Sequence, residues 1–186
     1  VGSGVVLANL ASDLQVAPKT VKSWLEVFER MYLTFSIYPY TKSLPRAIQK
    51  PPKVYFYDNA EVDLDEDRPD LGPRFENLVA NHLLKRIQFL EDLNGDRYQI
   101  FYLRDRENHE VDFLIEKNRK PVALIEAKLS DDKPSSHLNY FGEHLKISNR
   151  IQVVAYPKRI GRFNGIDVVR ASDFLSSDLA QEIWNL

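Results

Sequence analysis

The chain has 186 residues, of which 44% are hydrophobic and 28% charged, a composition typical of a globular protein with one large or two smaller domains. A net charge of −2 gives no overall basic field, so any contact with nucleic acid must be local. The sequence has no cysteine, which excludes disulfides, zinc–thiolate sites and cysteine nucleophiles. It also shows neither a signal peptide nor an apolar run of the about 20 residues that a bilayer requires, so we expect a cytoplasmic protein with no membrane partner.

The first 30 residues predict two helices separated by a turn. The apolar residues of the first helix follow helical spacing: Val6, Leu7, Leu10 and Leu14. Pro18 suits the first turn of the second helix. This order is that of a helix-turn-helix unit, whose second helix presents its N-terminal end to a DNA groove. The candidate DNA contacts at that end are Lys19, Thr20 and Lys22. Such units also serve as protein-binding modules, so both kinds of partner stay open.

Two alternating runs, at residues 33–38 and 53–57, then predict a pair of strands. With the helices they would form a winged helix-turn-helix module over residues 1–60, and the loop between them adds two candidate DNA contacts, Lys42 and Arg46. Residues 1–58 hold seven basic and four acidic side chains, a charge of +3, so the basic excess lies in this module. The first helix of a complete winged helix is missing, and we therefore expect the C-terminal piece of a longer polypeptide.

Residues 61–71 predict an acidic linker, and residues 72–186 a second domain. A long apolar stripe predicts a helix that opens at Gly72-Pro73, with Glu76 in its first turn. The following patterns predict a strand at 98–104, a hairpin at 110–128, a helix after 134, strands at 151–155 and 166–169, and a closing helix over 171–184. This order predicts an α/β domain whose mixed sheet carries helices on its faces.

Three ionisable residues interrupt the apolar pattern of the predicted hairpin: Asp112, Glu126 and Lys128. Glu126 and Lys128 share a face because strand side chains alternate. If paired residue numbers sum to 238, Asp112 lies opposite Glu126 and faces the same way, whereas an even-numbered loop would turn it away. Two close carboxylates favour a hard cation such as Mg²⁺ or Mn²⁺, and a nearby lysine can orient water or offset phosphate charge. An ordinary surface hairpin is the alternative that this motif leaves open.

An Asp followed ten to twenty residues later by Glu-x-Lys resembles the PD-(D/E)XK nucleases of restriction-endonuclease-like fold, with Val111-Asp112 in place of Pro-Asp. The whole chain is similar to the C-terminal region of a bacterial and archaeal family of AAA-type ATPases. Five stretches carry this resemblance: Leu10-Ala11…Thr20-Val21, Pro52-Lys53-Val54-Tyr55-Phe56-Tyr57-Asp58, Gly72…Phe75-Glu76-Asn77-Leu78-Val79, Arg104…Glu110-Val111-Asp112-Phe113 and Ile125-Glu126-Ala127-Lys128. The chain departs from the family at Asp58-Asn59-Ala60, where Asp-Thr/Ser-Gly is usual.

The resemblance implies that Asp112 and Glu126 are metal ligands and that Lys128 is the catalytic lysine. Glu76 matches the helix-borne acid of Holliday-junction-resolvase-like members, a third ligand. Arg104 could face a phosphate, or pair with Glu110. The resemblance also implies an ATPase domain upstream on the same polypeptide, through which the protein could form oligomers. Because the chain has no Gly-x-x-x-x-Gly-Lys-Ser/Thr motif, we expect no nucleotide to bind to it.

These patterns lead to three functional hypotheses. The first is a DNA nuclease that hydrolyses phosphodiester bonds with Mg²⁺ or Mn²⁺. The second is a catalytically inactive DNA- or protein-binding module of the ATPase, in which the nuclease fold is a scaffold. The third is a structural interaction domain that does neither. The charged set of Glu76, Asp112, Glu126 and Lys128 favours the first, because a decayed site tends to lose such residues.

Overall fold

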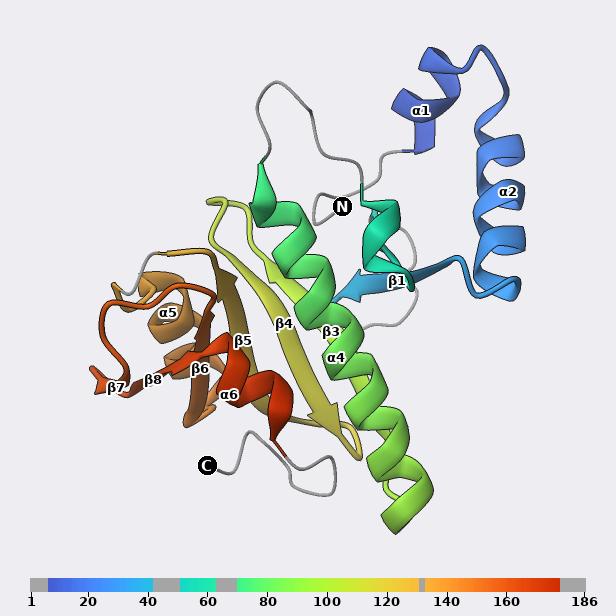
Figure 1. Ribbon diagram of the computed structural model, residues 1–186. Helices are drawn as coiled ribbons and strands as arrows, with labels where there is room; N and C mark the ends of the chain where they lie inside the picture. Colours follow the sequence, from blue (N-terminus) through green and yellow to red (C-terminus); the bar gives the residue numbers. More distant parts are fainter. Residues whose placement is uncertain (1–6, 42–50, 63–69, 131–132, 178–186) are drawn as a thin grey trace.

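The computed structural model describes residues 7–41, 51–62, 70–130 and 133–177, and its centre is one mixed sheet (Figure 1). The strands are β1 (Thr34–Pro39), β2 (Lys53–Phe56), β3 (Tyr98–Arg104), β4 (Glu110–Lys117), β5 (Lys120–Lys128), β6 (Asn149–Val154), β7 (Gly161–Phe163) and β8 (Ile166–Arg170). Their order across the eight-stranded sheet is β2-β1-β3-β4-β5-β6-β8-β7. The predicted mixed α/β class is confirmed. The short strand β7 was not predicted, and it pairs antiparallel with β8 at the far edge.

Helices lie on both faces of this sheet (Figure 1). The helices are α1 (Leu7–Asp13), α2 (Pro18–Arg30), α4 (Leu71–Asn94), α5 (Ser136–Leu145) and α6 (Ala171–Ser176), with a 3-10 turn η1 (Asn59–Glu61). On one face α4 and α6 pack against a core that includes Leu83, Phe113 and Ile125. On the other face α5 covers a second core that includes Leu114 and Leu124. The remainder of the predicted closing helix lies outside the described residues.

The N-terminal strands belong to the same sheet as the rest. β1 pairs antiparallel with β2, as predicted, but it also pairs in parallel with β3 through Tyr38 and Phe101. The two strands thus extend the large sheet, and their division from it as a separate domain stays a prediction. Among the described residues, no helix has both the length and the apolar character needed to cross a membrane.

The register of the β4–β5 hairpin was predicted, but its turn was not. Asn118 and Arg119 both have positive φ (49° and 65°) and form a two-residue turn, so Lys117 pairs with Lys120. Such an even-numbered loop alone would shift the register. An irregularity next to Pro121 adds one residue to β5, and from Ile115↔Ala123 onward the paired numbers sum to 238. The bulge therefore restores the register that the turn would have lost.

One edge of the sheet collects the ends of several strands. β1, β3, β5, β6 and β8 run parallel to one another, while β2 and β4 run the opposite way. The C-terminal ends of the first group therefore meet the N-terminal ends of the second. This edge carries Lys53 on β2, Arg104 on β3, Glu110 and Asp112 on β4, and Glu126 and Lys128 on β5.

Candidate functional site

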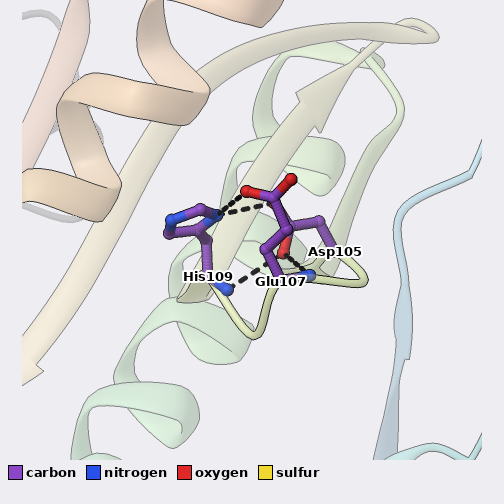
Figure 2. Close-up of side chains that lie close together, drawn as sticks. All are labelled: Asp105, Glu107 and His109. Carbon is purple, nitrogen blue, oxygen red and sulfur yellow. Dashed lines mark hydrogen bonds and ion pairs between the residues drawn. The ribbon is translucent and has the colours of Figure 1, made fainter.

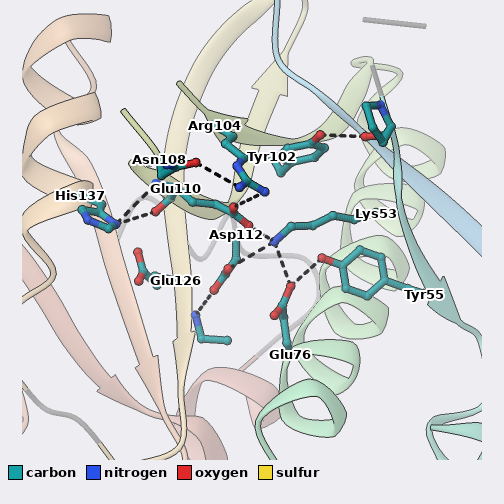
Figure 3. Close-up of polar contacts among 12 residues, drawn as sticks. Lys53, Tyr55, Glu76, Tyr102, Arg104, Asn108, Glu110, Asp112, Glu126 and His137 are labelled. Carbon is teal, nitrogen blue, oxygen red and sulfur yellow. Dashed lines mark hydrogen bonds and ion pairs between the residues drawn. The ribbon is translucent and has the colours of Figure 1, made fainter. Parts of the chain in front are cut away.

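Three carboxylates surround one lysine at this edge (Figure 3). We name Glu76, Glu110 and Asp112 the acid cluster. The Nζ atom of Lys53 lies 2.7 Å from Glu110 Oε1, 3.3 Å from Glu76 Oε1 and 3.5 Å from Asp112 Oδ1. The lysine side chain is 2% exposed, so the ammonium exchanges most of its hydration for these contacts.

Strand alternation and one helix anchor bring Lys53 and Glu76 together. Lys53 and Tyr55 point inward from β2, and the Tyr55 hydroxyl donates to Glu76 Oε1 at 2.7 Å. Glu76 lies near the start of α4. The next residue, Asn77, is fully buried; its Oδ1 accepts from the backbone N–H of Phe56 at 2.8 Å, and its Nδ2 donates to the Phe56 carbonyl at 3.1 Å. Asn77 therefore fixes the beginning of α4 against β2 and sets the distance between Glu76 and Lys53.

A second bulge determines where Asp112 points. Against β3, the pairs Phe101↔Leu114 and Leu103↔Val111 leave two residues of β4 opposite Tyr102. The alternation of side chains is broken at this point, and Asp112 turns toward the face of α4. Its Oδ2 accepts from the backbone N–H of Ala127 at 3.0 Å, so the carboxylate fills the gap where β4 and β5 separate.

Glu126 points toward the other face of the sheet, the face of α5. Its neighbours Ile125 and Ala127 contact the core under α4, whereas its own Oε2 accepts from the Ser135 hydroxyl at 3.1 Å. Lys128 Nζ lies 2.7 Å from Glu126 Oε1. The expectation that Asp112 and Glu126 share one face is therefore corrected. The pairing of β4 with β5 ends at Phe113↔Ile125, and next to it the bulge in β4 turns Asp112 toward α4, while Glu126 faces α5.

Buried Gln152 supports the Glu126 side of the site. It pairs with Glu126 in the register of β5 and β6. Its Oε1 accepts from Ser135 N at 2.9 Å, and its Nε2 donates to the Lys133 carbonyl at 3.0 Å. Gln152 thereby holds the start of α5, and with it the Ser135 hydroxyl, next to Glu126.

The pKa values of Asp112 and Glu126 indicate that too little positive charge lies near these two carboxylates to offset their burial. Burial, together with the charge of Glu76, raises the pKa of Asp112 to about 6, although Lys53 and Lys128 oppose the shift. Burial raises the pKa of Glu126 as well, and the charge of Asp112 adds to it, so the two carboxylates are electrostatic neighbours. Burial alone would lower the pKa of Lys53, but the acid cluster outweighs burial and raises it.

The donor atoms are of the kind that a hard divalent cation takes, but among the described residues the ligand atoms of Glu76, Asp112 and Glu126 do not all lie within 4.8 Å of one another. Glu76, Asp112 and Glu126 offer carboxylate oxygens, the ligands that Mg²⁺ and Mn²⁺ prefer, and two of these acids have raised pKa values that a cation would lower. The ammonium of Lys53 contacts Glu76 and Asp112 from one side. The side chain of Lys128, 41% exposed, lies next to Glu126 on the other.

Other predicted site residues lie at the rim or elsewhere. Arg104 Nη1 lies 3.6 Å from Glu110 Oε2, so the predicted alternative of an ion pair is what the structure shows, with the arginine side chain 52% exposed. Lys19, Thr20 and Lys22 lie on α2, which Figure 1 shows well away from α5. Lys22 contacts Glu26 at 3.9 Å, and its side chain is 64% exposed. Lys42 and Arg46 lie outside the described residues.

Five residues that shape the site were not predicted from the sequence: Lys53, Tyr55, Asn77, Ser135 and Gln152. One signal was available for Lys53. It begins an apolar strand at a position that, by alternation, shares the buried face of Tyr55, and a lysine on a buried face requires an acidic partner. The identity of that partner depends on the pairing of β1 with β3, which the sequence pattern does not specify.

A second group of ionisable side chains lies in the loop between β3 and β4: Asp105, Glu107 and His109 (Figure 2). Asp105 Oδ1 accepts from the backbone N–H of Glu107 at 2.8 Å and of His109 at 3.0 Å, and its Oδ2 lies 2.8 Å from His109 Nδ1. Although desolvation opposes the effect, these hydrogen bonds lower the pKa of Asp105. The loop itself therefore satisfies this carboxylate.

Two family models match the chain. One is described as a domain of unknown function (DUF4143) and matches residues 71–174; the other is described as a domain of unknown function (DUF8612) and matches residues 1–61. No curated protein and no solved structure matches. The first match contains Glu76, Asp112, Glu126 and Lys128, and the second contains Lys53. DUF4143 is typically the C-terminal region of AAA-ATPase-associated proteins. Since its model matches more than half of the 186 residues, the chain belongs to the DUF4143 family.

Proposed function

We propose that this chain is a metal-dependent DNA nuclease, the restriction-endonuclease-like part of an AAA-type ATPase. One observation carries the proposal. Asp112 and Glu126 lie directly beyond the last pair of β4 and β5, Phe113↔Ile125, and Asp112 Oδ2 accepts from Ala127 N at 3.0 Å, at an edge where Lys128 Nζ lies 2.7 Å from Glu126. This residue set resembles that of a PD-(D/E)XK site, and the raised pKa values of both acids support the proposal because an added cation would stabilise their charged forms.

Each residue has a defined task in this proposal. Asp112 and Glu126, with Glu76 as a third ligand, would hold Mg²⁺ or Mn²⁺, which supplies Lewis-acid polarisation of a phosphate and a lower pKa for a bound water. Ala127 N–H fixes Asp112, and Ser135 fixes Glu126. The ammonium of Lys128 would donate to the attacking water or to a phosphate oxygen. The half-exposed guanidinium of Arg104 would contact a neighbouring phosphate.

The N-terminal segment would bind the substrate or a partner. Two helices followed by an antiparallel strand pair have the order of a winged helix, and Lys19 and Lys22 are exposed on its second helix. We propose that these lysines and Thr20 contact duplex DNA, with an upstream ATPase domain of the same polypeptide as the partner that binds ATP and sets any oligomeric state. Charge reversal at Lys19 and Lys22 should then weaken binding and flatten its salt dependence. Unchanged affinity would favour a protein partner.

A second candidate function is a non-catalytic module of the ATPase. The contacts of Lys53 favour it, because a buried lysine that neutralises three carboxylates is also what a purely structural ion-pair network would contain. In that case the site would hold the N-terminal strands to the rest of the sheet. It would neither bind a metal nor cleave.

Cleavage assays with three variants separate these functions. The purified chain is incubated with branched, flapped and linear DNA in the presence of Mn²⁺ or Mg²⁺. We expect cleavage by the wild type, loss of cleavage with retained metal binding in Lys128→Ala, and loss of both in Asp112→Ala. Lys117→Ala is the matched control, because Lys117 pairs with Asp96 at the opposite end of β4, and it should cleave normally. Cleavage that persists in Lys128→Ala and Asp112→Ala would contradict the assignment, and so would no cleavage by the wild type.

A further inference from the structure

The cation within the acid cluster comes from a different part of the chain than the acids. Lys53 belongs to β2, in the segment matched by the DUF8612 model, whereas Glu76, Glu110 and Asp112 lie in the segment matched by the DUF4143 model. The lysine is nearly inaccessible and contacts all three carboxylates within 3.5 Å. The N-terminal segment therefore inserts a positive charge into the site that the larger family domain builds.

Lys53 contacts oxygen atoms of two of the residues that would hold the proposed metal, Glu76 and Asp112. A Mg²⁺ ion requires its ligand oxygens at about 2.1 Å. Glu76 Oε1 and Asp112 Oδ1 both contact Lys53 Nζ, so a metal bound to these oxygens would lie in or beside the volume of the ammonium. Two desolvated cations at that separation repel each other strongly. The cluster consequently has room for one of them at a time.

From this geometry we propose that Lys53 is a tethered competitor of the divalent metal, and that metal binding expels its ammonium from the acid cluster. The proposal rests on the proposed metal site. Glu110, which is the nearest partner of Lys53 and is not among the expected ligands, anchors the lysine when the metal is absent. The ring of Tyr102, whose centroid lies 5.6 Å from Nζ, already makes a cation–π contact with the ammonium and could keep that contact after the carboxylates are released.

This competition would connect the N-terminal segment to the chemistry of the site. Any shift of β2 that moves the Lys53 ammonium away from the acid cluster would allow the metal to bind. Any shift that returns the ammonium to the three carboxylates would prevent metal binding. Tyr55, two residues away on the same face, holds Glu76 through its hydroxyl, so the same strand positions one ligand and blocks it. A DNA or protein partner that binds the N-terminal segment could thereby control metal loading.

The test measures Mn²⁺ affinity in the wild type and in two lysine variants. Free Mn²⁺ is followed by electron paramagnetic resonance during titration of the wild type, Lys53→Met and the matched control Lys117→Met. We expect Kd to fall about tenfold or more in Lys53→Met, since removal of a full charge at contact distance exceeds one tenfold step, and to be unchanged in the control. Equal affinities of Lys53→Met and wild type would overturn the competition and leave the metal site standing. No binding by either protein would overturn both.

A second measurement uses the wild type alone, because Lys53→Met leaves three acids without their cation and could fail to fold. The rate of acetylation of each lysine by an amine-reactive reagent is followed by mass spectrometry with and without Mn²⁺. Lys53 should be protected without Mn²⁺ and several-fold more reactive at saturating Mn²⁺, while the rate at Lys117 stays constant. If Lys53 stays protected when Mn²⁺ is bound, the lysine and the metal occupy the site together, and the proposal is wrong.

Discussion

Two groups of acids lie at the same end of β4, and they differ in what satisfies them. In the loop before the strand, Asp105 accepts hydrogen bonds from two backbone N–H groups of its own loop and contacts His109. In the acid cluster, the carboxylates of Glu76, Glu110 and Asp112 come from two separate elements and converge on Lys53. The first group is local in the sequence, and the second forms only when the sheet is assembled.

Acids that the protein leaves without hydrogen bonds or enough positive charge are the ones that need a cation. Hydrogen bonds that overcome desolvation lower the pKa of Asp105, so its charged form is already stable. Burial and the charge of Glu76 raise the pKa of Asp112 in spite of Lys53. By spacing, the metal site would be Asp105, Glu107 and His109, because their ligand atoms lie within 4.8 Å of one another, whereas Glu76, Asp112 and Glu126 do not form such a group in the part of the chain that the structure describes. Unsatisfied charge, rather than proximity, distinguishes the candidate site.

The largest expected effect comes from removing the buried cation. Lys53→Met should lower the free energy of unfolding by about 3–5 kcal/mol at pH 7, the cost of breaking a buried ion pair from one side. The loss should shrink near pH 5, where the acids left behind can take up protons. Urea unfolding at both pH values measures it. Lys117→Met, which removes an ion pair with more exposed side chains, should cost about 1 kcal/mol or less. Equal losses in the two variants would remove the distinction between the two kinds of acid.

The next effect tests whether Asp112 is unfavourable when charged. Its pKa is about 6 in the folded protein and ordinarily 3.8, so the folded state binds more protons and loses stability as pH rises through this interval. Asp112→Asn should therefore be more stable than the wild type at pH 8, by up to about 3 kcal/mol, with the advantage vanishing below pH 4. Thermal unfolding across pH measures the difference. A variant less stable than the wild type at pH 8 would show that Asp112 is satisfied.

Metal binding should then stabilise the wild type but not the variant Asp112→Asn. At a Mn²⁺ concentration of 100 Kd, mass action raises the free energy of unfolding by about 2.7 kcal/mol. Asp112→Asn should show little of this gain, because it lacks one ligand. Differential scanning fluorimetry with and without Mn²⁺ measures both proteins, and EDTA should reverse the effect. A gain of equal size in Asp112→Asn would place the metal elsewhere.

The smallest effect belongs to the loop. Asp105→Asn should destabilise the protein less than Lys53→Met does, and its cost should disappear at low pH. The pKa of Asp105 is lowered, so its contribution is present above the ordinary pKa of an aspartate and is lost as pH falls through the folded value. The stabilisation by Mn²⁺ should be the same as in the wild type. If Asp105→Asn abolished it, the loop would be the metal site after all.

Much of the candidate site was predictable because local patterns determine it. The alternation of β4 and β5 gave the hairpin, and Glu126 and Lys128 follow on one face from period two alone. The helix that carries Glu76 was visible from its apolar stripe, and α4 begins within one residue of the expected position. These features depend on neighbours within about ten residues along the chain.

The same local patterns could not predict the position of Asp112 or the role of Lys53. Each bulge adds one residue to a strand without changing its apolar composition, so the break in alternation at Asp112 leaves no sequence signal. The two-residue turn at Asn118 and Arg119 would have reversed the prediction if the bulge near Pro121 had not compensated for it. Lys53 reaches the acids through the parallel pairing of β1 with β3, a contact between distant segments.

The most direct test of the central claim, that this sheet edge binds a divalent metal, is a crystal of the chain soaked in Mn²⁺ and measured at a wavelength with strong manganese anomalous scattering. We expect an anomalous peak between the carboxylates of Asp112 and Glu126, with Lys53 Nζ moved away from Asp112 Oδ1. An intact Lys53 contact to Asp112 with no peak at these carboxylates, at a millimolar Mn²⁺ concentration, would contradict it.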